Sequence, residues 1–168
     1  MLFQVITLAV FACLTAASPI DRRAGAPEYK PIPANCTVIN PLPHISNTTE
    51  SLNRCGKGLP AGYMPPANFS DNHLVYQAYF DQPFYSPEEQ AMQCLQQCFG
   101  FGGPGLDCKT AMLAYQVPTP KGWLGTEGGN VAATACMMFD TYLDPNMFIM
   151  APAGQYINET VGNLYCPS

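Results

Sequence analysis

The cysteines are the residues of this sequence with the most chemistry to offer. There are eight, and one of them, Cys13, lies in an N-terminal apolar run. The others are Cys36, Cys55, Cys94, Cys98, Cys108, Cys136 and Cys166. In an oxidising compartment such a set pairs into disulfides, although spacing alone does not fix the pairs. Cys94 and Cys98 lie one helical turn apart on a rigid backbone, so a bond between these two would be strained.

Zinc binding is the alternative use of the same cysteines. Cys94-x-x-x-Cys98 and the following Cys108 present three thiolate ligands at short spacing. An oxidising compartment favours disulfides over zinc, and neither His44 nor His73 lies near this cluster in the sequence. We therefore expect no metal site and no cofactor.

Residues for acid–base or nucleophilic catalysis are sparse. The motifs Gly-x-Ser-x-Gly and His-Glu-x-x-His do not occur in the sequence. We expect His44 to be solvated and His73 to begin a strand, at an edge or satisfied in the core. The carboxylates fit roles at a helix start or in turns: Glu88, Glu89, Asp81, Asp107, Glu127, Asp140 and Asp144. We expect no catalytic residue. A small secreted hydrolase acting on polysaccharide, with two paired carboxylates, is the alternative.

Three aromatic residues are candidates for ligand binding. Trp123 lies in a Gly-rich loop at 121–130, Phe101 lies in another at 100–105, and Tyr115 lies in a neighbouring strand. Aromatic side chains displayed in this way supply contact area at low entropic cost. The alternative is that Trp123 and Tyr115 fold back over the core, and the sequence leaves that open.

The elements that must position these residues are one helix and several strands. Ser86-Pro87-Glu88-Glu89 is a capping box with Pro in the first turn, which predicts a helix from Pro87 to about Cys98. Strands are predicted at 73–80, 109–117, 133–139 and 147–150, and the second should place residues 111, 113, 115 and 117 on one face. The fold class is therefore α+β.

The N-terminus indicates export. Residues 2–17 form an uncharged apolar run of signal-peptide length, with cleavage expected before Ser18 and a short membrane anchor as the alternative. Arg22-Arg23 fits either a processing site that ends a pro-peptide at 18–23 or an ordinary charged pair. Residues 24–54 are Pro-rich and predict an extended N-terminal arm, which leaves residues 55–168 as the domain.

Charge and hydropathy narrow the partners. The net charge is −5 and the basic residues are scattered, which argues against nucleic acid. No later apolar run approaches membrane-spanning length, so we expect no membrane insertion and an extracellular location. Sequons predict N-glycosylation at Asn35, Asn47, Asn68 and Asn158.

The order of these features resembles the PAN/apple domain family. The resemblance covers residues 55–166, and the segments CLQQC, CKTAMLAY and ACMMF are similar to fungal secreted PAN-like proteins. It implies a single helix packed on a curved antiparallel β-sheet. The implied disulfides are Cys94 with Cys136, Cys98 with Cys108, and Cys55 with Cys166.

Two features depart from the family pattern. The interval between Cys108 and Cys136 is long, because the loop that carries Trp123 is inserted there. Cys36 has no counterpart, so it is left unpaired, competing with Cys55 for Cys166, or bonded to a second chain in a disulfide-linked dimer.

PAN/apple domains bind proteins or carbohydrates. The resemblance therefore implies a secreted, non-enzymatic binding module for a glycan or an extracellular protein. The likeness to fungal proteins implies either association with the cell wall or an effector-like role towards a host. A structural cell-wall protein is a further alternative.

Overall fold

The main sheet is antiparallel and has five strands. The computed structural model describes residues 27–43, 61–80, 86–101, 107–123 and 127–167. The strand order is β1 (Thr37–Ile39), β7 (Ile157–Tyr165), β4 (Thr110–Pro118), β5 (Ala132–Phe139) and β3 (Leu74–Phe80). A second, two-stranded sheet pairs β2 (Tyr63–Met64) with β6 (Ile149–Met150). Within these described ranges the α-helices are α2 (Ala67–His73) and α3 (Pro87–Gly100). The predicted α+β class is confirmed in this general form.

Helix α3 begins as the sequence predicts and ends two residues later than expected. Ser86 Oγ accepts a hydrogen bond from the Glu89 backbone N–H at 3.2 Å, and Glu89 Oε2 accepts one from the Ser86 N–H at 2.9 Å. This reciprocal box satisfies two backbone donors that a helix start would otherwise leave unpaired. Ala91, Cys94, Leu95 and Cys98 are buried against one face of the sheet.

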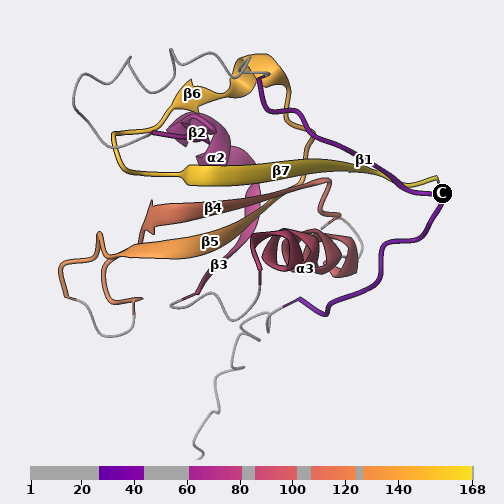
Figure 1. The fold of residues 1–168 in the computed structure, drawn as a ribbon, viewed down its shortest axis with the longest axis horizontal. Coiled ribbons are helices and arrows are strands. Elements are labelled where there is room, and N and C mark those ends of the chain that lie inside the picture. The colour runs from indigo at the N-terminus through magenta and orange to yellow at the C-terminus, as the bar shows by residue number, and fades with distance from the viewer. Residues whose placement is uncertain (1–26, 44–60, 81–85, 102–106, 124–126, 168) are drawn as a thin grey trace, which may run out of the picture.

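The central strands β4 and β5 are covered on both faces (Figure 1). Helix α3 packs on one face, while Phe69 from α2, Tyr63 from β2 and Phe148 pack on the other. Because both sets of side chains in these strands are buried, their sequences are apolar at nearly every position instead of alternating.

A β-bulge corrects the predicted facing of β4. Leu113 and Tyr115 lie on the α3 side as expected, but Val117 belongs to the cluster on the opposite side. The pairing with β5 shifts register between Ala114 and Val117, and Gln116 there has a φ of 57°. The extra residue reverses the alternation, which a sequence pattern cannot reveal.

Besides the two-residue strand β2, three elements were not predicted, and one of them is a second helix, so the expected single helix is wrong. Helix α2 has no buried residue and no side-chain cap, which leaves its sequence without a helical signature. Strand β7 contains Gly162 and Asn163, both weak strand formers. Both are nevertheless needed there: a Cβ on Gly162 would lie 2.6 Å from the Leu95 side chain, and Asn163 accepts a hydrogen bond from the Leu143 N–H at 3.1 Å.

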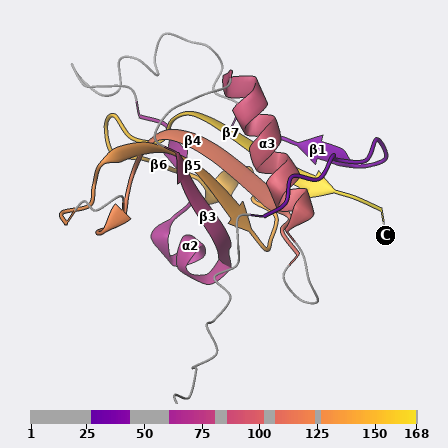
Figure 2. The ribbon, with the colours of Figure 1, turned by 90° about the horizontal axis from the view of Figure 1, so that it is seen from below.

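The third is β1, which lies in the segment predicted to be an arm outside the domain. The described part of that segment, residues 27–43, instead runs along the domain (Figure 2). The Lys30 N–H donates to the Gln96 carbonyl of α3 at 3.3 Å, and β1 then pairs with β7 at the edge of the sheet. This crossing needs Gly100, where a Cβ would lie 1.9 Å from the Glu28 carbonyl oxygen.

Three disulfides join these elements, and they correct one expected pairing. Cys94–Cys136 and Cys98–Cys108 are the bonds that the family resemblance implied. The third bond is Cys36–Cys166, so the expected Cys55–Cys166 pairing and the interpretation of Cys36 as unpaired or intermolecular are wrong.

The register of β1 explains that third bond. Thr37 pairs with Tyr165, which brings the next residues outward, Cys36 and Cys166, to a Cα–Cα distance of 4.2 Å. Cys55, His44 and Asn47 lie outside the described residues, as do the predicted signal peptide and pro-peptide.

Candidate functional site

A hollow of about 290 Å³ opens at the C-terminal end of α3, where the two described ends of the chain meet. We call it the aromatic hollow. Its walls combine rings, one carboxylate, one ammonium group and the sulfurs of cystines. The side chains used below are Phe99, Phe101, Asp107, Lys109, Tyr142 and Leu164, and Cys98, Cys108 and Cys166 complete the lining.

The backbone around the hollow is tightly held. The Phe101 N–H donates to the Cys98 carbonyl at 3.1 Å where α3 ends. The Lys109 N–H donates to the Phe139 carbonyl at 2.8 Å, and the Lys109 carbonyl accepts from the Leu164 N–H at 2.7 Å. The Lys109 backbone is thereby held between β5 and β7.

Two stacked tyrosines form the exposed rim of the hollow. The rings of Tyr142 and Tyr165 lie 4.3 Å apart between centroids with an interplanar angle of 14°, and the residues are 37% and 39% exposed. The Tyr142 hydroxyl donates to the Leu164 carbonyl at 3.3 Å. Lys109 Nζ lies 5.9 Å from the Tyr142 ring centroid, within cation–π range. The pair is therefore an exposed aromatic surface beside a positive charge.

The structure separates the three aromatic candidates. Phe101 lines the hollow. Tyr115 lies towards the other end of α3, where its hydroxyl donates to Gln90 Oε1 at 2.6 Å. Gln90 and Phe101 are eleven residues apart, about 16 Å along a helix. Trp123 is half-buried and meets Tyr79 edge-on at 5.8 Å, and Tyr79 packs on the opposite face of the sheet.

Sequence reasoning missed Lys109, Tyr142 and Tyr165 as site residues. Several residues of the hollow and its rim are immediate neighbours of cysteines. Phe99 follows Cys98, Asp107 and Lys109 flank Cys108, and Tyr165 precedes Cys166. Knowledge of the correct disulfide pairs would therefore have placed these neighbouring residues close together and pointed to the site. Tyr142 has no such signal.

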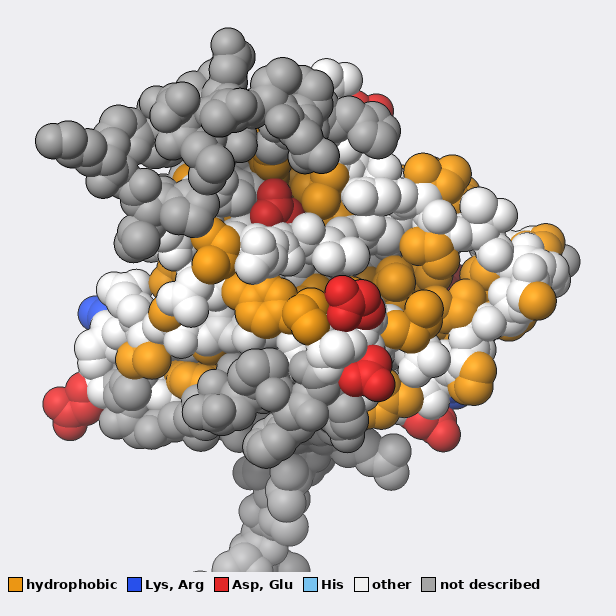
Figure 3. All heavy atoms as spheres, in the orientation of Figure 1, with side chains coloured by type: hydrophobic (Ala, Val, Ile, Leu, Met, Phe, Trp, Pro, Cys, Tyr) orange, Lys and Arg blue, Asp and Glu red, His pale blue; other side chains and the backbone are white. Residues whose placement is uncertain are grey.

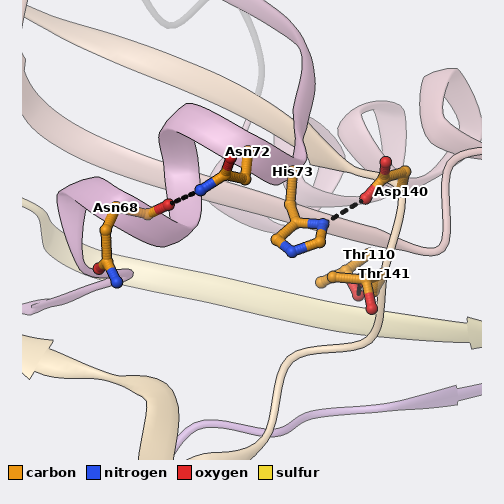
Figure 4. Close-up of polar contacts among 6 residues, drawn as sticks. All are labelled: Asn68, Asn72, His73, Thr110, Asp140 and Thr141. Atoms are coloured by element: carbon orange, nitrogen blue, oxygen red, sulfur yellow. Dashed lines mark hydrogen bonds and ion pairs between the residues drawn. The ribbon is translucent and has the colours of Figure 1, made fainter.

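A histidine–aspartate pair lies elsewhere, where α2 ends and β5 ends. His73 Nδ1 donates to Asp140 Oδ1 at 2.9 Å, and the two side chains are 41% and 42% exposed (Figure 4). Such a pair orients a general base in many hydrolases, but it needs a nucleophile on the other ring nitrogen. Thr110 is fully buried and its hydroxyl is hydrogen-bonded to Asn163 Oδ1 at 2.6 Å. In the part of the chain that the structure describes, no hydroxyl or thiol is hydrogen-bonded to His73.

Three further carboxylates of the described residues have structural partners. Glu89 caps α3, Asp144 accepts from the Asn146 N–H at 2.9 Å, and Glu159 accepts from the Tyr63 N–H at 2.9 Å. Asp81 lies outside the described residues. Within the described ranges, no group of three or more potential ligands is arranged to hold a metal ion.

The surface charge is sparse. On the face shown in Figure 3, acidic side chains are scattered among hydrophobic and polar ones, and basic side chains are few among the residues described. None of the helices in the described ranges is long and apolar enough to cross a membrane.

Comparison of the chain with protein-family models, curated proteins and solved structures finds no match.

Proposed function

We propose that this chain is a secreted, non-enzymatic binding module of the PAN/apple type, which holds an extracellular glycan or protein at the aromatic hollow. The observation that carries the proposal is the Tyr142–Tyr165 stack, exposed beside Lys109 at the mouth of the hollow. Exposed aromatic rings held by a fixed scaffold are the usual anchors of binding surfaces.

Secretion is supported by independent features of the chain. Three disulfides persist only where the surroundings are oxidising. The asparagines of three sequons, Asn35, Asn68 and Asn158, are exposed and open to glycosylation. The apolar N-terminal run is of the length and charge that a signal peptide has.

The PAN/apple assignment is supported by the way α3 is attached. Cys94–Cys136 joins the helix to a central strand, and Cys98–Cys108 joins it to the start of the neighbouring strand. These are the inner bonds that the family resemblance implies. The outer bond, Cys36–Cys166, is this chain's departure from the family pattern.

The test is to compare binding of the purified chain and two variants to an array of glycans and purified extracellular proteins. We expect the chain to retain a defined set of ligands and Tyr142→Ala to lose them. Met150→Ala removes a similarly exposed apolar side chain on β6, away from the hollow, and should bind as the unmodified chain does. Binding that survives Tyr142→Ala would contradict the proposed site.

A further inference from the structure

We infer that the aromatic hollow takes a neutral saccharide, with one sugar ring inside it. This inference rests on the binding role proposed above and narrows its ligand to one chemical class. Three properties of the hollow point to this class: the composition of its walls, the balance of its charges and its size.

The walls suit the two kinds of surface that a pyranose ring presents. A sugar ring has apolar C–H faces and a rim of hydroxyls. Phe99 and Phe101 offer aromatic surface for the C–H faces, and Tyr142, whose ring is stacked on Tyr165 and lies under Lys109 Nζ, adds its exposed edge. Asp107 accepts hydrogen bonds and Lys109 donates them, so adjacent hydroxyls can be both donor and acceptor at the rim.

The charges of the hollow select against ionic ligands. Asp107 and Lys109 are both exposed, flank Cys108 in the chain and line the same hollow with opposite charge. A uronic acid or sulfated sugar would face the Asp107 carboxylate, and a cationic ligand would face the Lys109 ammonium group. The hydroxyls of a neutral sugar can hydrogen-bond to both the Asp107 carboxylate and the Lys109 ammonium group. The site therefore discriminates by repelling charged ligands as well as by attracting neutral ones. The net charge of −5 adds a long-range repulsion towards polyanions.

The size and rigidity of the hollow fit a single ring. A volume of about 290 Å³ lies just below the roughly 300–1,000 Å³ typical of ligand sites, which suits a small ligand unit. The rest of an oligosaccharide would then cross the exposed Tyr142–Tyr165 rim. Lys109 is held by backbone bonds to β5 and β7, and two cystines fix the walls, so binding orders little of the protein.

The experiment titrates the full secreted chain with defined hexasaccharides at pH 7. The neutral probes are oligomers of glucose, mannose and N-acetylglucosamine, and the anionic probe is an oligomer of galacturonic acid. Affinity is measured by calorimetry, and the binding residues are mapped by NMR shifts. We expect at least one neutral probe to bind and shift the signals of Tyr142 and Lys109. We expect the affinity for the galacturonate oligomer to be lower by at least about tenfold.

Matched variants locate the interaction. Tyr142→Ala should weaken binding of the neutral probe about tenfold, whereas Tyr142→Phe, which keeps the ring, should stay within about twofold. Lys109→Ala and Asp107→Asn should each weaken it, and Lys121→Ala and Asp71→Asn, which make the same charge changes on exposed residues elsewhere, should not. Asp107→Asn should also narrow the gap between the neutral and anionic probes.

The outcomes separate the ligand class from the site. If the galacturonate oligomer binds the hollow as tightly as the neutral probes, the neutral class is wrong and the binding role stands. The same holds if no saccharide binds while a purified protein shifts the Tyr142 signals. If a probe binds equally to Tyr142→Ala and to the unmodified chain, the hollow is not the site and the proposed function fails with it.

Discussion

The disulfides of the described residues fall into two groups that differ in burial. The core staples, Cys94–Cys136 and Cys98–Cys108, tie α3 to the sheet, and Cys94, Cys98 and Cys136 are 3%, 1% and 0% exposed. The terminal clasp, Cys36–Cys166, ties the short edge strand β1 to the end of β7, and Cys166 is exposed.

Loop length and burial predict opposite orders for how much each disulfide contributes to the stability of the fold. The clasp spans 130 residues and the staple Cys94–Cys136 spans 42, so chain entropy alone favours the clasp. The staple, however, lies within a core that α3, β4 and β5 share, whereas the clasp holds a strand of three residues at an edge. We therefore expect the staples to hold the fold and the clasp to shape the binding surface.

The largest effect is expected from removing a core staple. Cys94→Ala combined with Cys136→Ala should lower the free energy of unfolding by about 5 kcal/mol, of which about 4 is lost loop constraint and the rest lost packing. Urea unfolding of the oxidised protein measures this value. The matched control is the clasp variant below, and a staple variant more stable than that control would contradict the ranking.

Removing the clasp should have a smaller and more local effect. Cys36→Ala combined with Cys166→Ala releases a chain constraint worth about 5 kcal/mol at most, and the freed ends of the folded state regain part of that entropy. We expect a loss of about 2–3 kcal/mol. In hydrogen exchange, β1 should lose protection while α3, β4 and β5 keep theirs. Uniform loss of protection across the sheet would show that the clasp holds the fold.

Two glycines extend the comparison to the backbone. A Cβ on Gly62 would lie 1.6 Å from the Tyr156 carbonyl oxygen, and both backbone groups of Gly62 are hydrogen-bonded, so Gly62→Ala should cost about 2–3 kcal/mol. Gly100→Ala must displace the backbone of exposed Glu28, which lies at the surface, and should cost about 1–2 kcal/mol. Thermal unfolding compares them with Gly128→Ala, where nothing lies within 4 Å. Equal losses at Gly62 and Gly128 would contradict the packing described.

The smallest effect concerns the far end of α3. Tyr115→Phe removes the hydrogen bond to buried Gln90 and should cost about 1 kcal/mol. Burial, with a smaller contribution from Glu88, raises the Tyr115 pKa above its ordinary 10.0. The unfolded chain then releases this proton first, so the stabilisation is complete below pH 10 and is lost as pH rises through the folded-state pKa. Unfolding free energies measured across that range should fall more steeply for the unmodified chain than for Tyr115→Phe.

The same contrast explains how much the sequence could predict. Helix α3 was predictable because its start is encoded locally, in Ser86 and Glu89. Strands β4 and β5 were predictable because both of their faces are buried, which gives long apolar runs. These are the elements joined by the core staples.

The region of the clasp was not predictable from local patterns. Strand β1 is a strand only because Thr37 pairs with Tyr165, a contact between opposite ends of the described chain. Gly162 in β7 disfavours a strand by local propensity, and only the Leu95 side chain packed over it explains why a glycine is there. The candidate site shares this property, since Phe101 was found from its loop while Tyr142 joins the hollow only through tertiary packing.

Opening the clasp and measuring ligand binding in the same sample tests most directly whether Cys36–Cys166 shapes the binding surface. Mild reduction followed by alkylation should modify Cys36 and Cys166 before the buried cysteines, because Cys166 is exposed. We predict that the near-UV circular dichroism of the core is kept, while affinity for the best neutral oligosaccharide falls about tenfold, since Tyr165 and Cys166 leave the hollow. Unchanged affinity with the clasp open, or loss of affinity only when the whole domain unfolds, would contradict a role of the clasp in shaping the binding surface.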